Sequence, residues 1–293
     1  MFKIALYLMG EKGLHVLEEY IKMSSLCQAE YVVCARDKQI KNDYFEDIKS
    51  LALSNSIKFL ERGVDPIPDT ELNFYFAISW RWLIKEKLEK LIVFHDSLLP
   101  KYRGFNPLVT ALIEGDTNIG VTAILASESF DRGNIIGCES IQIEYPIKIE
   151  FAINIISKLY GKLFYSIINK MFLNELTEDI QVDANATYSL WRDEEDYIID
   201  WNQSSSKIKR FIDAVGYPYN GAKSSIDGIE LTILESELYE DLKIINNIPG
   251  KIFFIINNEP VVVCGSGLLK LTNVVERKTN QPYFFNKTRA RLK

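Results

Sequence analysis

The sequence predicts an α/β fold in which a Rossmann-like, doubly wound and mostly parallel sheet is followed by a smaller C-terminal open β-barrel (OB-like) domain. Short apolar runs, typical of buried strands, alternate with segments of helical apolar spacing up to residue 171. Near residue 188 this alternation gives way to short β-rich runs separated by turn signals. We therefore expect one domain over residues 1–188 and another over residues 189–293.

The composition is that of an ordinary globular protein, with 47% hydrophobic and 25% charged residues in a chain of 293. No run approaches the roughly 18 consecutive apolar residues of a membrane helix. The apolar N-terminal run is also too short for a signal peptide, and no small-residue cleavage site follows it. We expect a soluble, cytoplasmic protein with no membrane partner.

Charge and cysteine usage exclude two further classes. The net charge is −6, whereas a protein that binds a long phosphate backbone usually carries a concentrated basic face, so we expect no nucleic-acid partner. The cysteines form no CxxC pair and have no histidine at metal-ligand spacing, so we expect reduced, mostly buried thiols and no metal site. They are Cys27, Cys34, Cys138 and Cys264.

The N-terminal region is typical of a strand, a helix and a second strand in succession. An apolar run over 3–9 ends at Gly10, helical spacing follows to residue 23, and a second run covers 31–35. Gly10 and Gly13 do not complete a GxGxxG fingerprint, so we interpret this turn as structural. The next predicted elements are a helix over 43–54, a strand over 57–60, a loop over 62–69, a strand over 74–78 and a short helix over 83–88.

The most informative stretch begins at the apolar run 91–94. It ends in His95, one of two histidines, and continues as a polar loop that contains Pro100 and ends at Gly104. Enzymes with α/β folds present catalytic side chains in this way at the carboxyl edge of the sheet. Beyond it, the pattern predicts a helix over 107–113, a strand over 120–126, a long amphipathic helix over 149–171, and strands over 229–234, 250–256, 260–264 and 268–274.

The segment HDSLLPKYRG, residues 95–104, resembles the HxSLLPxYRG signature of the folate-dependent formyltransferases, which move a formyl group from 10-formyltetrahydrofolate to an amine. Two more matches follow in order, GVT at 120–122 and the DxGxI motif at 131–135. Segments between residues 188 and 222 resemble the linker and the start of the second domain in that family. The resemblance covers nearly the whole chain.

The resemblance implies that His95 and Asp131 are catalytic. Formyl transfer requires removal of a proton from the amine and stabilisation of the oxyanion that forms at the formyl carbon. An imidazole and a carboxylate that converge on one point can supply both functions. Taken alone, the histidine could be structural and the aspartate could belong to a turn.

The resemblance also implies where the ligands bind. The expected cofactor is 10-formyltetrahydrofolate. In the family, the loop after strand 74–78 lies against the pterin ring of the folate. Simple packing, with a snorkelling arginine, is the alternative for the two indoles and the arginine of this loop. The expected cofactor-binding residues are Ser79, Trp80, Arg81, Ser129 and Phe130. The expected acceptor-binding residues are Ser97, Lys101, Tyr102 and Arg103, with the two cations as anion contacts. For Arg103, support of the fold is an equal alternative.

Two positions depart from the family pattern NxHxSLLP. Val93 stands where the family has asparagine, and losing one oxyanion donor costs other enzymes about 10²–10³ in turnover. Either catalysis is weak or another donor substitutes: a backbone amide, protonated His95, Ser97 or Asn106. Asp96 replaces the proline or glycine that is frequent in the family, and it either caps the loop or favours the charged form of His95.

Two branches of the family share this plan, methionyl-tRNA formyltransferase and the sugar N-formyltransferases that act on nucleoside-diphosphate amino sugars. A tRNA enzyme should carry a positively charged surface, and the net charge of −6 argues the other way. We predict the sugar N-formyltransferase, with a role in surface polysaccharide biosynthesis. The alternatives are the tRNA enzyme and, because of Val93, a non-catalytic member that binds folate or a nucleotide sugar. Sugar-modifying relatives are often dimers, so we expect a homodimer.

Overall fold

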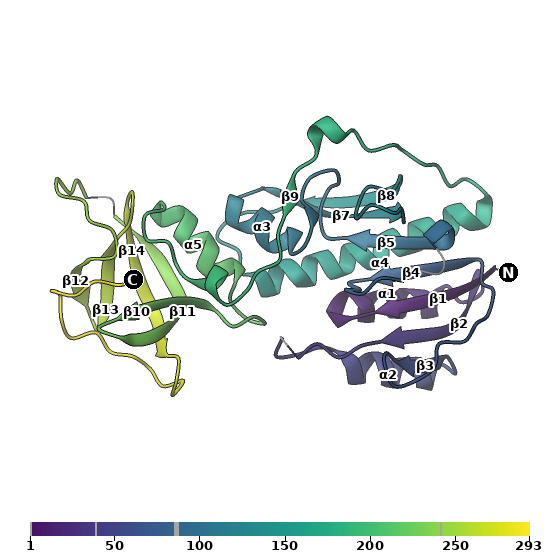
Figure 1. Cartoon of the computed structure of the whole chain (residues 1–293), viewed down its shortest axis with the longest axis horizontal. Coiled ribbons are helices and arrows are strands. Elements are labelled where there is room, and N and C mark those ends of the chain that lie inside the picture. The colour runs from purple at the N-terminus through teal and green to yellow at the C-terminus, as the bar shows by residue number, and fades with distance from the viewer. Residues whose placement is uncertain (1, 39, 85–87, 241) are drawn as a thin grey trace. The chain divides into compact units, whose positions relative to one another are not determined.

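The computed structural model of the chain describes residues 2–38, 40–84, 88–240 and 242–293 (Figure 1). The chain forms two compact units, both discontinuous in sequence. The first comprises residues 1–108, 117–143 and 151–191. The second comprises residues 109–116, 144–150 and 192–293.

The first unit contains a seven-stranded sheet with the strand order β3-β2-β1-β4-β5-β7-β8. The strands β3 to β5 in this order are parallel, whereas β7 runs antiparallel to β5 and β8 antiparallel to β7. This arrangement confirms the predicted doubly wound, mostly parallel sheet. The strands are β1 (Phe2–Leu8), β2 (Cys27–Cys34), β3 (Lys58–Glu61), β4 (Phe74–Ile78), β5 (Leu91–His95), β7 (Asn118–Leu125) and β8 (Ile135–Gln142).

The strand order places a topological switch point between β1 and β4. From β1 the chain continues to β2 and β3 on one side, and then returns to β4 and β5 on the other. In open α/β sheets, ligands bind outside the carboxyl ends of the strands at such a point. Gly10 follows β1 there, Ser79 follows β4, and His95 ends the next strand. The fold therefore brings the predicted cofactor loop and the histidine to one edge.

Helices cover the sheet because each buries an apolar stripe against it. Helices α1 (Gly10–Lys22) and α2 (Phe45–Ser54) belong to this unit, as does α4 (Ile149–Leu173) from residue 151 on. By length and composition α4 could span a membrane, but half of its most apolar window is buried, including Tyr160 and Phe164. It is a core helix of this unit. The helix predicted over 83–88 falls partly on residues 85–87, which lie outside the described residues; Leu88–Lys90 forms the 3-10 turn η1.

The second unit is built on a five-stranded antiparallel sheet with the order β10-β11-β14-β13-β12. Helix α5 (Ser205–Ala214) packs on β11, and residues 109–116, which include most of helix α3 (Pro107–Glu114), also belong to this unit. In that strand order β10 and β12 are the two edges, so the sheet is open. Its strands are β10 (Ala222–Ile226), β11 (Ile229–Tyr239), β12 (Ile252–Ile256), β13 (Glu259–Val263) and β14 (Leu268–Glu276).

Candidate active site

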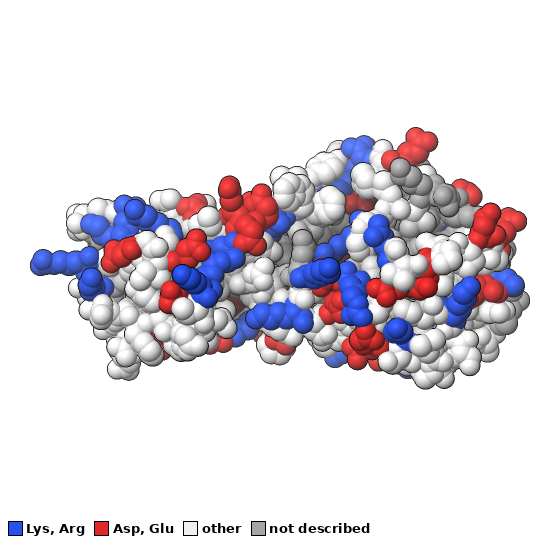
Figure 2. All heavy atoms as spheres, turned by 60° about the horizontal axis from the view of Figure 1, so that its bottom comes forward, with Lys and Arg blue, Asp and Glu red and all other residues white. Residues whose placement is uncertain are grey.

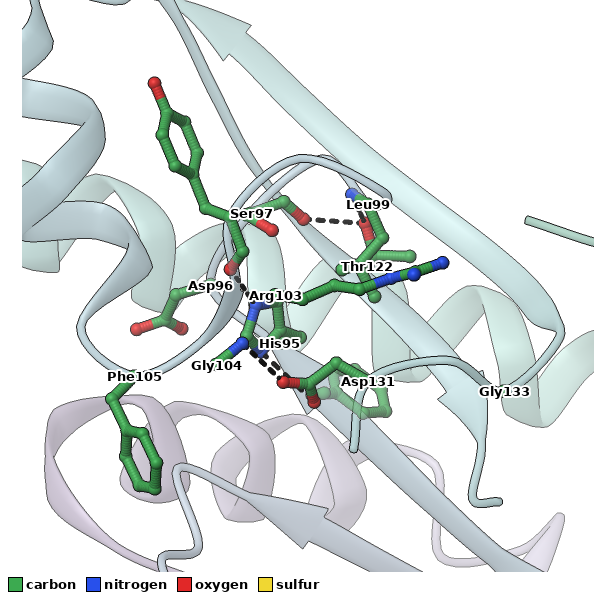
Figure 3. A network of polar contacts seen from close by, with 12 residues as sticks. His95, Asp96, Ser97, Leu99, Arg103, Gly104, Phe105, Thr122, Asp131 and Gly133 are labelled. Carbon is green, nitrogen blue, oxygen red and sulfur yellow. Dashed lines mark hydrogen bonds and ion pairs between the residues drawn. The ribbon is translucent and has the colours of Figure 1, made fainter. Parts of the chain in front are cut away.

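His95 lies at the carboxyl end of β5 with its side chain buried. Its Nε2 is 2.8 Å from the carbonyl oxygen of Tyr102, and its Nδ1 is 3.6 Å from Oδ1 of Asp131 (Figure 3). Both ring nitrogens therefore face oxygen acceptors. The ring is therefore held between a backbone carbonyl on one side and a carboxylate on the other.

Asp131 reaches this site from the loop that joins β7 to β8, with its backbone in the left-handed region at φ 54°. Its Oδ2 accepts a 2.8 Å hydrogen bond from the backbone N–H of Gly104, which fixes the carboxylate beside His95. Gly133 is required in the same loop, because a Cβ there would lie 1.6 Å from the carbonyl oxygen of Leu125. The DxGxI motif thus combines the carboxylate that faces His95 with one sterically necessary glycine.

The loop after His95 is closed by hydroxyl groups. Ser97 Oγ donates a 2.6 Å hydrogen bond to the carbonyl of Lys101, and Thr122 Oγ1 donates one of 2.6 Å to the carbonyl of Ser97. Thr122 Oγ1 also accepts from the backbone N–H of Leu99 at 3.1 Å. The SLLPKYRG and GVT motifs therefore meet in the fold. The Ser97 hydroxyl is buried and engaged within the loop, which favours a structural role over the predicted acceptor contact.

Arg103 is buried, with 1% of its surface exposed. Its Nη2 and Nε donate to Oε1 of Gln181 at 2.8 and 3.1 Å, and its Nη1 donates to Oδ1 of Asp183 at 2.8 Å. A guanidinium that is occupied in this way has little capacity left for a phosphate. The arrangement favours the alternative that Arg103 supports the fold. Lys101 is exposed and Tyr102 is half-buried, so the remaining predicted acceptor contacts are on the accessible part of the loop.

The predicted cofactor residues after β4 lie at the switch point. Trp80 packs edge-to-face against Tyr7 and Trp82, with ring centroids 5.1 and 5.2 Å apart, and Arg81 forms a 2.5 Å ion pair with Asp37. The indole Nε1 of Trp80 is buried and donates to no acceptor among the residues that the structure describes. Because an unpaired buried N–H is costly, this donor suits a bound group that carries a hydrogen-bond acceptor.

The other two predicted cofactor residues belong to the Asp131 loop. Ser129 is exposed, and its carbonyl accepts a 2.7 Å hydrogen bond from Ser127 Oγ. Phe130 has 71% of its surface exposed. An exposed aromatic ring directly before the carboxylate provides an apolar surface for a ligand at the site.

Val93 is half-buried on β5, where it pairs with Ala77 of β4 and Ile124 of β7. It packs against the apolar cluster on its face of the sheet, and its side chain offers methyl groups where the family has an amide. Among the predicted substitutes for the family asparagine, the Ser97 hydroxyl is occupied and Asn106 is exposed. A backbone amide and protonated His95 remain as the candidates.

Gln181 was not predicted from the sequence. Its Nε2 donates 2.8 Å hydrogen bonds to the carbonyls of Asp131 and Gly133, while its Oε1 accepts from Arg103. It therefore couples the loop that carries Asp131 to the loop that follows His95. A glutamine in an irregular segment after α4 carries no pattern by which it could be identified.

Comparisons with known proteins show what the chain is similar to. The formyl transferase family model matches residues 73–150, and the model of the formyl transferase C-terminal domain matches residues 192–288. The bifunctional polymyxin resistance protein ArnA of Wigglesworthia glossinidia brevipalpis is 33% identical over 269 residues, which cover 83% of this chain and 39% of ArnA. The chain thus spans less than half the length of that relative. Methionyl-tRNA formyltransferase of Clostridium novyi is 27% identical over 240 residues, covering 78% and 77%.

Two solved structures share the fold over nearly the whole chain. One is WlaRD, a sugar 3N-formyl transferase in the presence of dTDP and 5-N-formyl-THF, with a TM-score of 0.70, 22% identity, and coverage of 93% of this chain and 97% of that one. The other is an N-formyltransferase from Helicobacter canadensis in complex with folinic acid and dTDP-3-aminofucose. Its TM-score is 0.68 at 19% identity, with coverage of 97% and 100%.

Proposed function

Because the chain belongs to the formyl transferase family, we propose that it transfers a formyl group from 10-formyltetrahydrofolate to the amine of a nucleoside-diphosphate amino sugar. The observation that carries this proposal is the convergence of His95 and Asp131, within 3.6 Å of each other, beside the switch point of the sheet. A metal ion has no part in the proposed chemistry.

The two side chains divide the work. When bound, 10-formyltetrahydrofolate supplies the formyl carbon. Asp131, held by the Gly104 N–H, accepts the proton that the amine loses as its nitrogen bonds to that carbon. His95, protonated between Asp131 and the Tyr102 carbonyl, stabilises the negative charge on the formyl oxygen. It then supplies a proton to the departing folate nitrogen as the old carbon–nitrogen bond breaks.

The residues at the switch point fit the folate. Trp80 offers an aromatic surface and an indole N–H with no acceptor among the described residues, and Phe130 offers an exposed ring next to Asp131 in the chain. We assign Ser79, Arg81 and Ser129 to the same binding region on position alone. Structures with the same fold hold 5-N-formyl-THF, folinic acid or tetrahydrofolic acid.

Two observations support an amino sugar as the acceptor. Structures that match the chain over its length contain dTDP or dTDP-3-aminofucose. The chain is also acidic overall, and on the face shown in Figure 2 acidic side chains lie among the basic ones. The sequence relatives of the methionyl-tRNA type make initiator tRNA the second candidate. The proposal for the sugar enzyme includes that the protein forms a homodimer.

The test measures tetrahydrofolate release with a panel of nucleoside-diphosphate 3-amino and 4-amino sugars and, separately, with charged initiator tRNA. Turnover with one sugar, unaffected by moderate salt, is the expected result. Turnover with tRNA alone, falling steeply as the salt concentration rises, would show that the acceptor is tRNA and not an amino sugar. Folate binding without any turnover would favour the non-catalytic alternative.

A further inference from the structure

A largely buried polar network lies directly beside His95. Asp96 follows β5, and its Oδ2 pairs with the Nζ of Lys12 in the first turn of α1. Its Oδ1 accepts a hydrogen bond from the hydroxyl of Tyr160 in the middle of α4. The Lys12 and Asp96 side chains are 14% and 18% exposed, and Tyr160 is 1% exposed. Three elements that are distant in sequence thus meet at the residue next to the catalytic histidine.

The network holds a defined charge state. Burial raises the pKa of the Asp96 carboxyl, but the charge and hydrogen bond of Lys12 and the hydrogen bond of Tyr160 outweigh it, and the pKa lies below its ordinary value. Burial, followed by the charge of Asp96, places the pKa of the Tyr160 hydroxyl well above its ordinary value. At neutral pH an ionised carboxylate therefore accepts from a charged amine and a neutral phenol.

Asp96 cannot take the place of Asp131 in the chemistry. Figure 3 shows its carboxylate pointing away from Asp131, and its two partners come from helices that cover the sheet. The backbone around it is fixed from both sides. The Tyr160 hydroxyl lies 3.3 Å from the carbonyl oxygen of Phe94, and the Ser97 N–H donates to the His95 carbonyl at 2.8 Å. Movement of Asp96 would therefore move His95.

We propose that Lys12, Asp96 and Tyr160 form a positioning network that holds the backbone at His95, so that the imidazole stays between Asp131 and the Tyr102 carbonyl. The role rests on the proposed function, since it supposes that His95 is catalytic. It also gives a role to the departure at position 96, where a proline or glycine would have no carboxylate to anchor. Removing one partner of a largely buried ion pair leaves the charge of the other without compensation.

The test uses Asp96→Asn and Tyr160→Phe, each of which removes one member of the network with little change in shape. Tyr20→Phe is the matched control, because the Tyr20 hydroxyl is likewise buried in a helix-to-strand contact, where it accepts a 2.8 Å hydrogen bond from the backbone N–H of Ala29 in β2. Displacement of a catalytic group by about 1 Å costs roughly 10²-fold in rate. We expect Asp96→Asn to lower kcat by about this factor and Tyr160→Phe by about 10-fold, with KM for both substrates unchanged and Tyr20→Phe close to wild type.

A second measurement does not require activity. The chain has two histidines, His15 and His95, so side-chain ¹H–¹⁵N spectra report each ring, with His15→Gln assigning the signals. We expect the network variants to shift the His95 signals and to leave those of His15 in place. Unchanged kcat and unchanged His95 signals in both variants would overturn the proposal, as would equal loss of kcat in Tyr20→Phe. If wild type showed no formyl transfer, the proposed function would fail, and the His95 signals would decide the positioning role separately. Should Asp96→Asn not fold, Tyr160→Phe alone decides.

Discussion

Nδ1 of His95 lies 3.6 Å from Oδ1 of Asp131, although 35 residues separate them in the chain. The relationship depends on two backbone supports, the Tyr102 carbonyl at the other ring nitrogen and the Gly104 N–H at the other carboxylate oxygen. Both supports come from the loop that the SLLPKYRG motif builds. The motif therefore fixes the orientation of both side chains as well as supplying one of them.

Lys101 and Arg103, two cations in the loop after His95, should behave differently when they are replaced. Arg103→Met should lower the free energy of unfolding by about 1–3 kcal/mol, because Gln181 loses its buried partner. Lys101→Met, on an exposed side chain, should leave stability unchanged and raise KM for the acceptor. Urea unfolding and steady-state kinetics on both variants check this. The opposite pattern would return Arg103 to the acceptor site.

Val93→Asn should increase kcat. The substitution restores a hydrogen-bond donor two residues before His95, on the same face of β5. It should also cost about 1–3 kcal/mol of stability, since the position packs against an apolar cluster. Val93→Thr is a control of similar shape. A fall in kcat in the asparagine variant, with the protein still folded, would show that no donor is missing at this position.

The acid stability of the protein should depend on Asp96. Because its pKa is lowered in the folded state, its ionised form contributes stability that is complete above the unfolded pKa, about 3.9, and is lost as pH falls through the lower folded value. Asp96→Asn should therefore be less stable than wild type near neutral pH, and the difference should shrink as pH falls below about 4. Urea unfolding at a series of pH values measures it. A difference that is constant with pH would contradict the charged pairing.

Thiol reactivity should be limited to one position. Cys27, Cys34 and Cys264 are buried, and burial raises the pKa of each thiol to about 12, whereas Cys138 is exposed on β8. We expect a thiol reagent to modify one cysteine rapidly in the folded protein and all four in denaturant. Cys138→Ser should abolish the rapid phase. Persistence of that phase would show that a buried cysteine becomes accessible.

The sequence predicted the parallel strands well because strands buried on both faces are continuous apolar runs. It missed β8 and β10, in which exposed or small polar residues interrupt the apolar pattern, as in the sequence AKSSI of β10. It also gave no sign that residues 109–116 and 144–150 belong to the second unit. That grouping depends on tertiary contacts, which no local pattern encodes.

The sequence predicted those site residues that lie within recognisable motifs. Resemblance, rather than spacing, paired His95 with Asp131, and the structure brings them together. The partners of Asp96 could not be predicted, because Lys12 and Tyr160 are 84 and 64 residues away from it and belong to ordinary helical patterns. Gln181 was not predicted for the same reason. Positions that act through long-range hydrogen bonds are the ones that sequence patterns leave out.

The most direct test of formyl transfer by His95 and Asp131 compares wild type with Asp131→Asn and His95→Asn in single-turnover assays of tetrahydrofolate release. Binding of 5-formyltetrahydrofolate is measured on the same preparations. Loss of positioned proton transfer should reduce the rate by about 10²–10⁴-fold in each variant while the folate still binds. Variants that retain the wild-type rate would contradict the assignment of these two residues.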